Sequence, residues 1–158
     1  MNSVQIINRE LLEKVASLAR ESPRRRRNYN FHETASDACH RLLNAIEPDS
    51  YIQPHCHREI TKEETLIVVR GRLGVILFDD HGAVTAAVAL VPASESVGVN
   101  IPHGVYHTLV ALESGSVFFE AKAGPFVPLM PDEKASWAPA EGDAQAASYL
   151  KKIKQRFA

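Results

Sequence analysis

The sequence predicts an all-β domain of the closed or sandwiched antiparallel class, with a helix at each end. From Arg41 to Gly124 the chain is a series of short β-type segments. Turn signals separate these segments, among them Glu47-Pro48-Asp49 and Asp79-Asp80-His81-Gly82. No helical pattern interrupts the series, which argues against a βαβ sheet. The length of 158 residues suits one domain with a single core.

The elements follow from hydrophobic periodicity. Residues 8–21 predict a helix capped by Asn8, with an apolar stripe of Leu11, Leu12, Val15, Leu18 and Ala19. The expected strands cover 41–46, 50–55, 64–71, 73–78, 83–91, 97–101, 107–112 and 116–122. Residues 143–157 predict a second helix capped by Asp143, with a stripe of Ala146, Tyr149, Leu150, Ile153 and Phe157. Residues 125–142 are expected to be an ordered loop over the barrel.

Composition excludes several classes of function. The net charge of −1 gives no overall field that would recruit nucleic acid or an anionic membrane. Neither a signal-peptide core nor a membrane span is apparent. Two cysteines, Cys39 and Cys56, form no CxxC pair and no disulfide framework, so a reducing cytoplasm is the expected location.

Histidines and a glutamate suggest a metal site. In a strand His55 and His57 would face one side while Cys56 faces the other, and two converging imidazoles suit one divalent ion. Glu64 opens the next strand, with Glu63 as the competing carboxylate of opposite parity. His107 follows the turn at Pro102 and Gly104 and would complete a three-histidine, one-carboxylate set. The ion itself stays undetermined among Fe, Mn, Ni, Zn and Co.

These residues resemble the two cupin motifs. HxH, Glu64 and a glycine after six residues (Gly71) match the first, although the interval from His57 to Glu64 is longer than usual. Residues 102–107 (PHGVYH) match the second, PxGxxH. The resemblance implies a cupin double-stranded β-helix (jelly-roll) barrel with a metal held by His55, His57, Glu64 and His107. We therefore expect a single cupin domain, 1–158, that consists of an N-terminal helical region (1–23), a barrel (41–124) and a C-terminal helix (143–157).

More narrowly, residues 28–33, 40–57, 101–110, 120–128 and 137–142 are similar to the WbuC family of cupin-fold metalloproteins. That family is associated with bacterial surface-polysaccharide gene clusters. The resemblance supplies no reaction, and the leading hypothesis rests on the metal: an ion that polarises a substrate carbonyl favours a metal-dependent enzyme of isomerase or lyase type acting on a small sugar-derived or carboxylated metabolite. An Fe(II)-dependent dioxygenase and a non-catalytic metal-bearing ligand-binding module are the alternatives. By analogy with other cupins, we expect a homodimer. We expect it to bind a small-molecule ligand or substrate, and not nucleic acid or a membrane.

Further residues are predicted to contact the substrate. Tyr106 and Lys122 are candidate acid–base groups because each lies on or beside a strand that carries a ligand. The basic run 24–27 is either a solvated face or a site for an anionic group, with Arg27 as its representative. Asn30, His32 and Arg41 complete the predicted substrate-binding set, on an arm that packs against the barrel or closes over its cavity.

Overall fold

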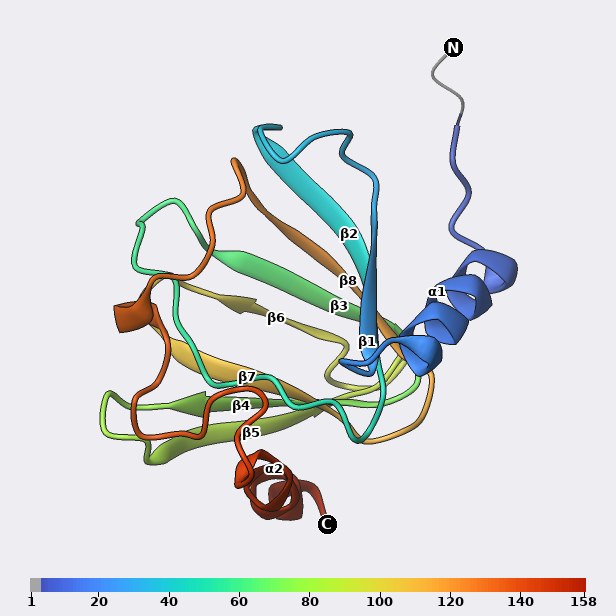
Figure 1. Cartoon of the computed structure of the whole chain (residues 1–158). Helices are drawn as coiled ribbons and strands as arrows, with labels where there is room; N and C mark the ends of the chain where they lie inside the picture. The colour runs from blue at the N-terminus through green and yellow to red at the C-terminus, as the bar shows by residue number, and fades with distance from the viewer. Residues whose placement is uncertain (1–3) are drawn as a thin grey trace.

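The computed structural model describes residues 4–158 as two facing antiparallel sheets with a helix packed outside each one (Figure 1). The five-stranded sheet has the order β1-β2-β8-β3-β6, and the three-stranded sheet has the order β5-β4-β7. The strands are β1 (Arg26–Asn30), β2 (Cys39–Ile46), β3 (Glu64–Arg70), β4 (Leu73–Phe78), β5 (Val84–Leu90), β6 (Gly98–Ile101), β7 (Tyr106–Ala111) and β8 (Ser116–Ala123). The helices are α1 (Arg9–Glu21) and α2 (Ala146–Lys154), with 3₁₀ turns at Pro131–Glu133 and Gln155–Phe157.

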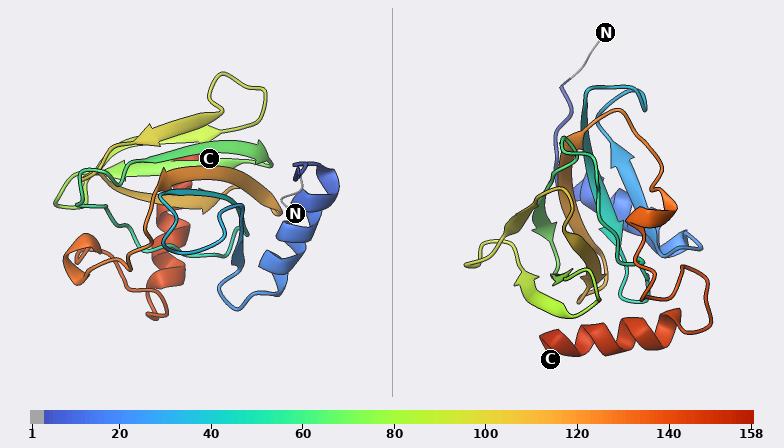
Figure 2. Two further views of the ribbon diagram at one scale, coloured as in Figure 1. Left: turned by 90° about the horizontal axis from the view of Figure 1, so that it is seen from above. Right: turned by 90° about the vertical axis from the view of Figure 1, so that its left-hand side faces the viewer.

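Strand alternation separates the core between the sheets from the two outer faces. Every second residue of a strand points to the same side. Thus Leu66, Val68, Val75, Leu109 and Phe118 pack between the sheets. Figure 2 shows the resulting layers from above.

Each helix buries an apolar stripe on the outer face of one sheet. Val15, Ala16 and Ala19 of α1 pack against Leu43 and Val117 of the five-stranded sheet. The Asn8 side chain accepts a hydrogen bond from the Leu11 amide (3.0 Å), which confirms the predicted cap. Leu18, predicted to lie on the buried stripe, is instead exposed, and Ala16 takes its place.

The second helix covers the three-stranded sheet. Ala146, Leu150 and Ile153 of α2 pack against Ile76 and Val110. The predicted stripe is confirmed, although the N-cap is Gln145 rather than Asp143, which binds the Gln145 amide through its carboxylate (2.7 Å).

Three expectations about the barrel need correction. Residues 50–55 form no strand, and only His55 makes an isolated bridge there. The polar segment Arg26–Asn30 is a strand, paired with β2. In the described part of the chain, no strand of one sheet pairs with a strand of the other, so the jelly roll is a sandwich rather than a closed barrel. Residues 1–3 of the predicted N-terminal helical region lie outside the described residues.

The segment that follows β8 returns across the sandwich, as the predicted covering loop would. The Cys56 amide donates to the Glu133 carbonyl (2.9 Å), and the Ala135 amide donates to the Pro54 carbonyl (2.9 Å). These bonds fasten the segment over the stretch that carries His55 and His57. Among the described residues no helix has the length and apolar character needed to cross a membrane.

Candidate metal centre

Backbone pairing brings His55 and His107 together. The His55 amide donates to the His107 carbonyl (3.0 Å), and the His107 amide donates to the His55 carbonyl (2.8 Å). Nearby, the Gly104 amide donates to the His57 carbonyl (2.7 Å), in a turn where Gly104 has a φ of +78°. The glycine of the PxGxxH segment is therefore needed for its left-handed backbone conformation. These bonds seat all three histidines around one point.

The three imidazoles converge closely enough to share one ion. One ring nitrogen from each of His55, His57 and His107 lies within 4.8 Å of the others. Nitrogens bound to one ion at about 2.0–2.2 Å lie about 3.0–3.6 Å apart in tetrahedral or facial octahedral geometry. The three rings would therefore move closer together around a single divalent cation, and the donor set fits Fe, Mn, Ni, Zn or Co.

Backbone carbonyls orient two of the three rings. The Nδ1–H of His55 donates to the Gln53 carbonyl (3.0 Å), and the Nδ1–H of His107 donates to the Val105 carbonyl (2.9 Å). In each ring Nδ1 is thus engaged by a carbonyl, which leaves Nε2 as the nitrogen that would bind a metal. Burial, together with the neighbouring His107, lowers the pKa of His55 to about 3, so this imidazole is neutral at physiological pH.

Glu64 supplies the carboxylate, and Glu63 faces the opposite way. Glu64 Oε1 lies 2.8 Å from His57 Nε2, and Glu64 Oε2 lies 3.4 Å from His107 Nε2. Glu63 is exposed and accepts a hydrogen bond from Asn100. Burial would raise the pKa of Glu64, but hydrogen bonds from His107 and His57 and the charge of Lys122 hold it well below its usual value.

A buried polar chain leads from the histidines into the five-stranded sheet. Lys122 Nζ lies 3.1 Å from Glu64 Oε1 and 2.6 Å from Glu120 Oε1. Asn44 Nδ2 donates to Glu120 Oε2 (2.6 Å). Burial opposes the charge on Lys122, but the two carboxylates outweigh it and raise its pKa. Burial also raises the pKa of Glu120. Lys122 is therefore a fixed ammonium beside the predicted carboxylate ligand.

Two cavities meet at this centre. The larger, of about 750 Å³, is lined by His55, His57 and Lys122 at its inner end. The smaller, of about 270 Å³, is lined by His55, His107, Glu64, Glu120 and Lys122. Because His55 and Lys122 border both, a ligand in either cavity would reach the same polar cluster.

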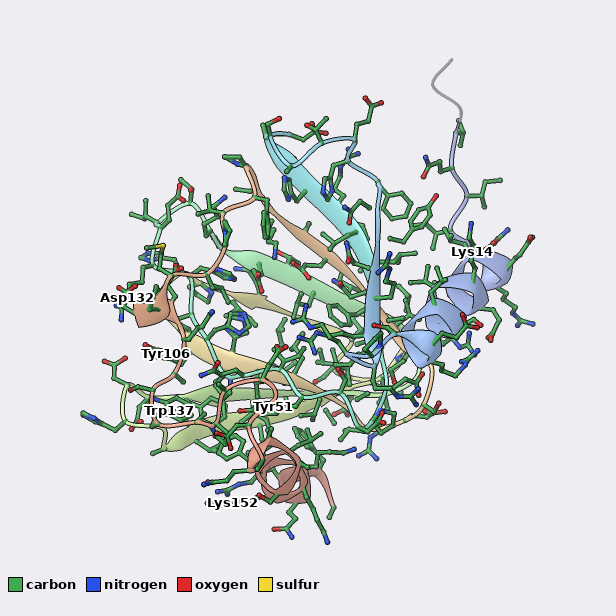
Figure 3. All side chains as sticks on the ribbon, viewed as in Figure 1. Lys14, Tyr51, Tyr106, Asp132, Trp137 and Lys152 are labelled. Atoms are coloured by element: carbon green, nitrogen blue, oxygen red, sulfur yellow. The ribbon has the colours of Figure 1, made fainter. Side chains whose placement is uncertain are left out.

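Lys122 is thus brought to the predicted metal ligands, whereas Tyr106 is not. Tyr106 immediately precedes His107 in β7, so its side chain points to the outer face of the sheet. There its hydroxyl donates to the Asp132 carbonyl (3.2 Å) and its ring packs edge-on against Trp137. Figure 3 shows Tyr106, Asp132 and Trp137 gathered on this side. The position of Tyr106 therefore gives no support to its predicted role as a catalytic group.

Cys56 also faces away from the histidines, as strand parity predicts. It is fully buried in the cluster that contains Tyr106 and Phe78, while Cys39 is exposed. The two cysteines therefore lie in different environments, and neither is among the residues that converge on the histidines.

The predicted substrate-binding residues lie along β1 and β2, at the edge of the site. Arg27 is exposed and reaches only the border of the smaller cavity. Asn30 is exposed and accepts a hydrogen bond from Asn28 (2.6 Å). Arg41 alternates out of the interior, and its backbone binds the Nδ1 of His32. None of the four lines the larger cavity, so that part of the prediction is not supported by their positions.

Three residues that the sequence did not single out also line these cavities: His40, Lys62 and Glu120. His40 lies opposite Lys122 in the pairing of β2 with β8. Strand alternation could have indicated Glu120, because it faces the same side as Lys122 two residues later. Lys62 had no such signal, because its position depends on which strands and loops meet. Arg24 and Arg26 of the predicted basic run line both cavities.

Comparisons with known proteins agree with this fold. KdgF from Halomonas sp. is 20% identical over 67% of this chain and 84% of its own, with a TM-score of 0.52. A cupin superfamily protein from Desulfitobacterium hafniense is 12% identical over 69% of this chain and 86% of its own, with a TM-score of 0.51. A cupin 2 domain-containing protein from Halorhodospira halophila is 18% identical over 80% of this chain and 77% of its own, with a TM-score of 0.50.

These likenesses establish the cupin jelly-roll fold. A comparison with curated proteins found no match. Residues 7–90, more than half of the chain, match the family model described as "Domain of unknown function (DUF6016)". With its cupin fold and its converging histidines, the chain belongs to the DUF6016 family.

Proposed function

We propose that the protein is a metal-dependent cupin enzyme of isomerase or lyase type, acting on a small carboxylated or sugar-derived metabolite. The observation that carries this proposal is the convergence of His55, His57 and His107, of which His55 and His57 line a cavity of about 750 Å³. Three protein nitrogens and one carboxylate would leave coordination positions for a substrate.

The proposed roles follow from the contacts. His55, His57 and His107 hold the ion, with Glu64 as a fourth ligand. When bound, a divalent ion supplies Lewis-acid polarisation of a substrate carbonyl. Lys122 keeps its proton, because Glu64 and Glu120 raise its pKa. It would therefore stabilise negative charge on the substrate instead of serving as a base.

The proposal extends to the biological setting. Similarity to the WbuC family in segments outside the two metal motifs, such as 28–33 and 137–142, favours a role in bacterial surface-polysaccharide metabolism. We also propose a cytoplasmic homodimer that binds a small molecule.

Metal analysis of tag-free protein tests the site. Wild-type protein should retain about one divalent ion per chain after desalting, and His107→Gln should lose most of it. His103→Gln is the matched control, because His103 is exposed in the same turn and is not one of the converging histidines. A wild type that binds no divalent ion, or a control that loses its ion equally, would refute the site.

Turnover tests the reaction. The metal-loaded protein would be incubated with hydroxy acids, keto acids and nucleotide sugars, under air and under argon, with products identified by mass spectrometry. Oxygen-independent conversion that His107→Gln abolishes would support an isomerase or lyase. Conversion that requires iron and air would assign a dioxygenase instead, and tight binding without conversion would assign a ligand-binding module.

A further inference from the structure

One wall of the larger cavity is apolar, whereas its inner end, at His55, His57 and Lys122, is polar. Four apolar residues and two prolines follow β8 and line one side: Pro125, Phe126, Val127, Pro128, Leu129 and Met130. Three of these large side chains are more than half exposed, with exposed fractions of 60% for Phe126, 54% for Val127 and 56% for Met130. Exposed apolar area of this kind, gathered along one wall of a cavity, is typical of a ligand-binding surface.

The wall is held in place at both ends. The Phe126 amide donates to the Ala35 carbonyl (2.7 Å), and the Gly124 amide donates to the Ala38 carbonyl (2.9 Å). At the other end the Met130 amide donates to Glu133 Oε2 (2.8 Å). These bonds keep the segment from collapsing onto the cavity floor. The apolar wall is therefore formed before any ligand arrives, which lowers the entropic cost of binding.

A buried ammonium lies where this wall meets the metal ligands. Lys62 is 8% exposed, and its Nζ donates to the carbonyls of Ala123 (3.0 Å) and Pro125 (2.5 Å). Its hydrogen-bond partners are neutral, so within residues 4–158 no carboxylate neutralises this charge. A buried cation with only neutral partners favours an anionic ligand.

The charge balance of the cavity points the same way. Five cationic side chains line it (Arg24, Arg26, Lys62, Lys122 and Lys134) against three carboxylates (Glu59, Glu133 and Glu141). Arg24 and Arg26 share Glu141, and Lys122 is paired with Glu64 and Glu120. Lys62, whose hydrogen-bond partners are both carbonyls, is therefore the buried cation of this lining that lacks a carboxylate partner among the described residues.

We infer that the larger cavity takes an organic acid with an apolar substituent. Its carboxylate binds at the inner end, beside Lys62 and Lys122, and its substituent lies against the wall of residues 125–130. This inference rests on the proposed function, and it narrows the substrate class from carboxylated or sugar-derived metabolites to acids with an apolar tail.

A series of 2-oxo acids tests the inference by isothermal titration calorimetry on metal-loaded protein. Pyruvate, 2-oxobutanoate and 2-oxohexanoate present the same acid with growing apolar tails. Burial of a methylene contributes about 0.8 kcal/mol, which corresponds to about a fourfold decrease in Kd per added methylene. A hydroxylated acid of equal length, 2-oxogluconate, should bind no more tightly than pyruvate.

Two variants locate the effect. Phe126→Ser should flatten the dependence of Kd on chain length. Ile67→Ser is its control, because Ile67 is an exposed apolar residue on the outer face of β3. Lys62→Gln should weaken every acid by about tenfold, as expected for a charge-assisted contact, and Lys62→Arg should restore most of the loss. Thermal unfolding of each variant checks that it is folded.

The outcomes separate this inference from the proposed function. A protein that binds its metal but shows equal Kd values along the series, or prefers 2-oxogluconate, overturns the apolar-tail inference and leaves the metal site standing. An unchanged slope in Phe126→Ser also overturns it. Loss of metal binding in the wild type would instead refute the proposed function itself.

Discussion

Lys122 bridges two buried carboxylates, and replacing it by methionine should strongly destabilise the metal-free protein. Its Nζ lies 3.1 Å from Glu64 Oε1 and 2.6 Å from Glu120 Oε1. Removing one partner of a buried ion pair costs about 3–5 kcal/mol, because the remaining charge has no compensation. One quarter of the Lys122 side chain is exposed, so we expect the low end of this range, about 3 kcal/mol.

Urea unfolding in the presence of a chelator measures this free energy of unfolding. Lys151→Met is the control, because Lys151 lies on the exposed face of α2 and should change stability by less than about 0.5 kcal/mol. A second substitution, Glu120→Gln, should recover part of the loss in the Lys122→Met background, since it removes one of the two uncompensated charges.

Added divalent metal should stabilise Lys122→Met more than it stabilises wild type. In the variant, no ammonium neutralises the Glu64 carboxylate, so its full negative charge attracts the ion and the metal is bound more tightly. The reasoning would be refuted if Lys122→Met cost less than about 1 kcal/mol without metal, or if metal stabilised both proteins equally.

Three further outcomes follow from the same structure. The pKa of His55 is 6.5 unfolded and about 3 folded, so the unfolded state binds more protons between these pH values. This contribution to the stability of the metal-free protein should therefore be fully present above about pH 6.5 and decrease toward pH 3, by at most about 1.4 kcal/mol per pH unit. His55→Gln should make the decrease shallower in urea titrations at several pH values, and an identical slope would contradict this. Gly104→Ala should cost about 1–2 kcal/mol, because φ is +78° and no atom crowds the added Cβ, with Gly104→Asn costing less; equal urea midpoints for all three proteins would count against it. Asn8→Ala should cost about 1 kcal/mol through loss of the α1 cap, and an unchanged midpoint would show that the cap contributes nothing.

Local patterns predicted most of the sheets and the orientation of the metal ligands. Period-2 alternation located seven of the strands, and the same alternation placed Glu64 inward and Glu63 outward. It also separated Cys56 from the two histidines. Applied consistently to β7, it would have turned Tyr106 away from the site, because Tyr106 and His107 are adjacent.

Other features had no local signal. The segment Arg26–Asn30 is polar throughout, and it is a strand because β2 offers it a partner. Conversely, residues 50–55 have strand-like composition but lie in a connection where the structure provides only the isolated bridge at His55. Amino-acid composition shows whether a segment can form a strand, but the strand forms only where a neighbouring strand is available to pair with it.

The sequence by itself therefore determined the all-β class, the two flanking helices and the residue types of the metal cluster, because these depend on spacing along one chain. Only the tertiary structure decided which charges share the site and what surrounds it. Lys122 meets Glu64 and Glu120 because β8 lies between β2 and β3. The apolar wall of residues 125–130 lines the cavity because its ends are fastened to Ala35 and Glu133. Apart from the Met130–Glu133 bond, these contacts join residues distant in sequence, and strand order and loop anchoring, rather than local periodicity, determine them.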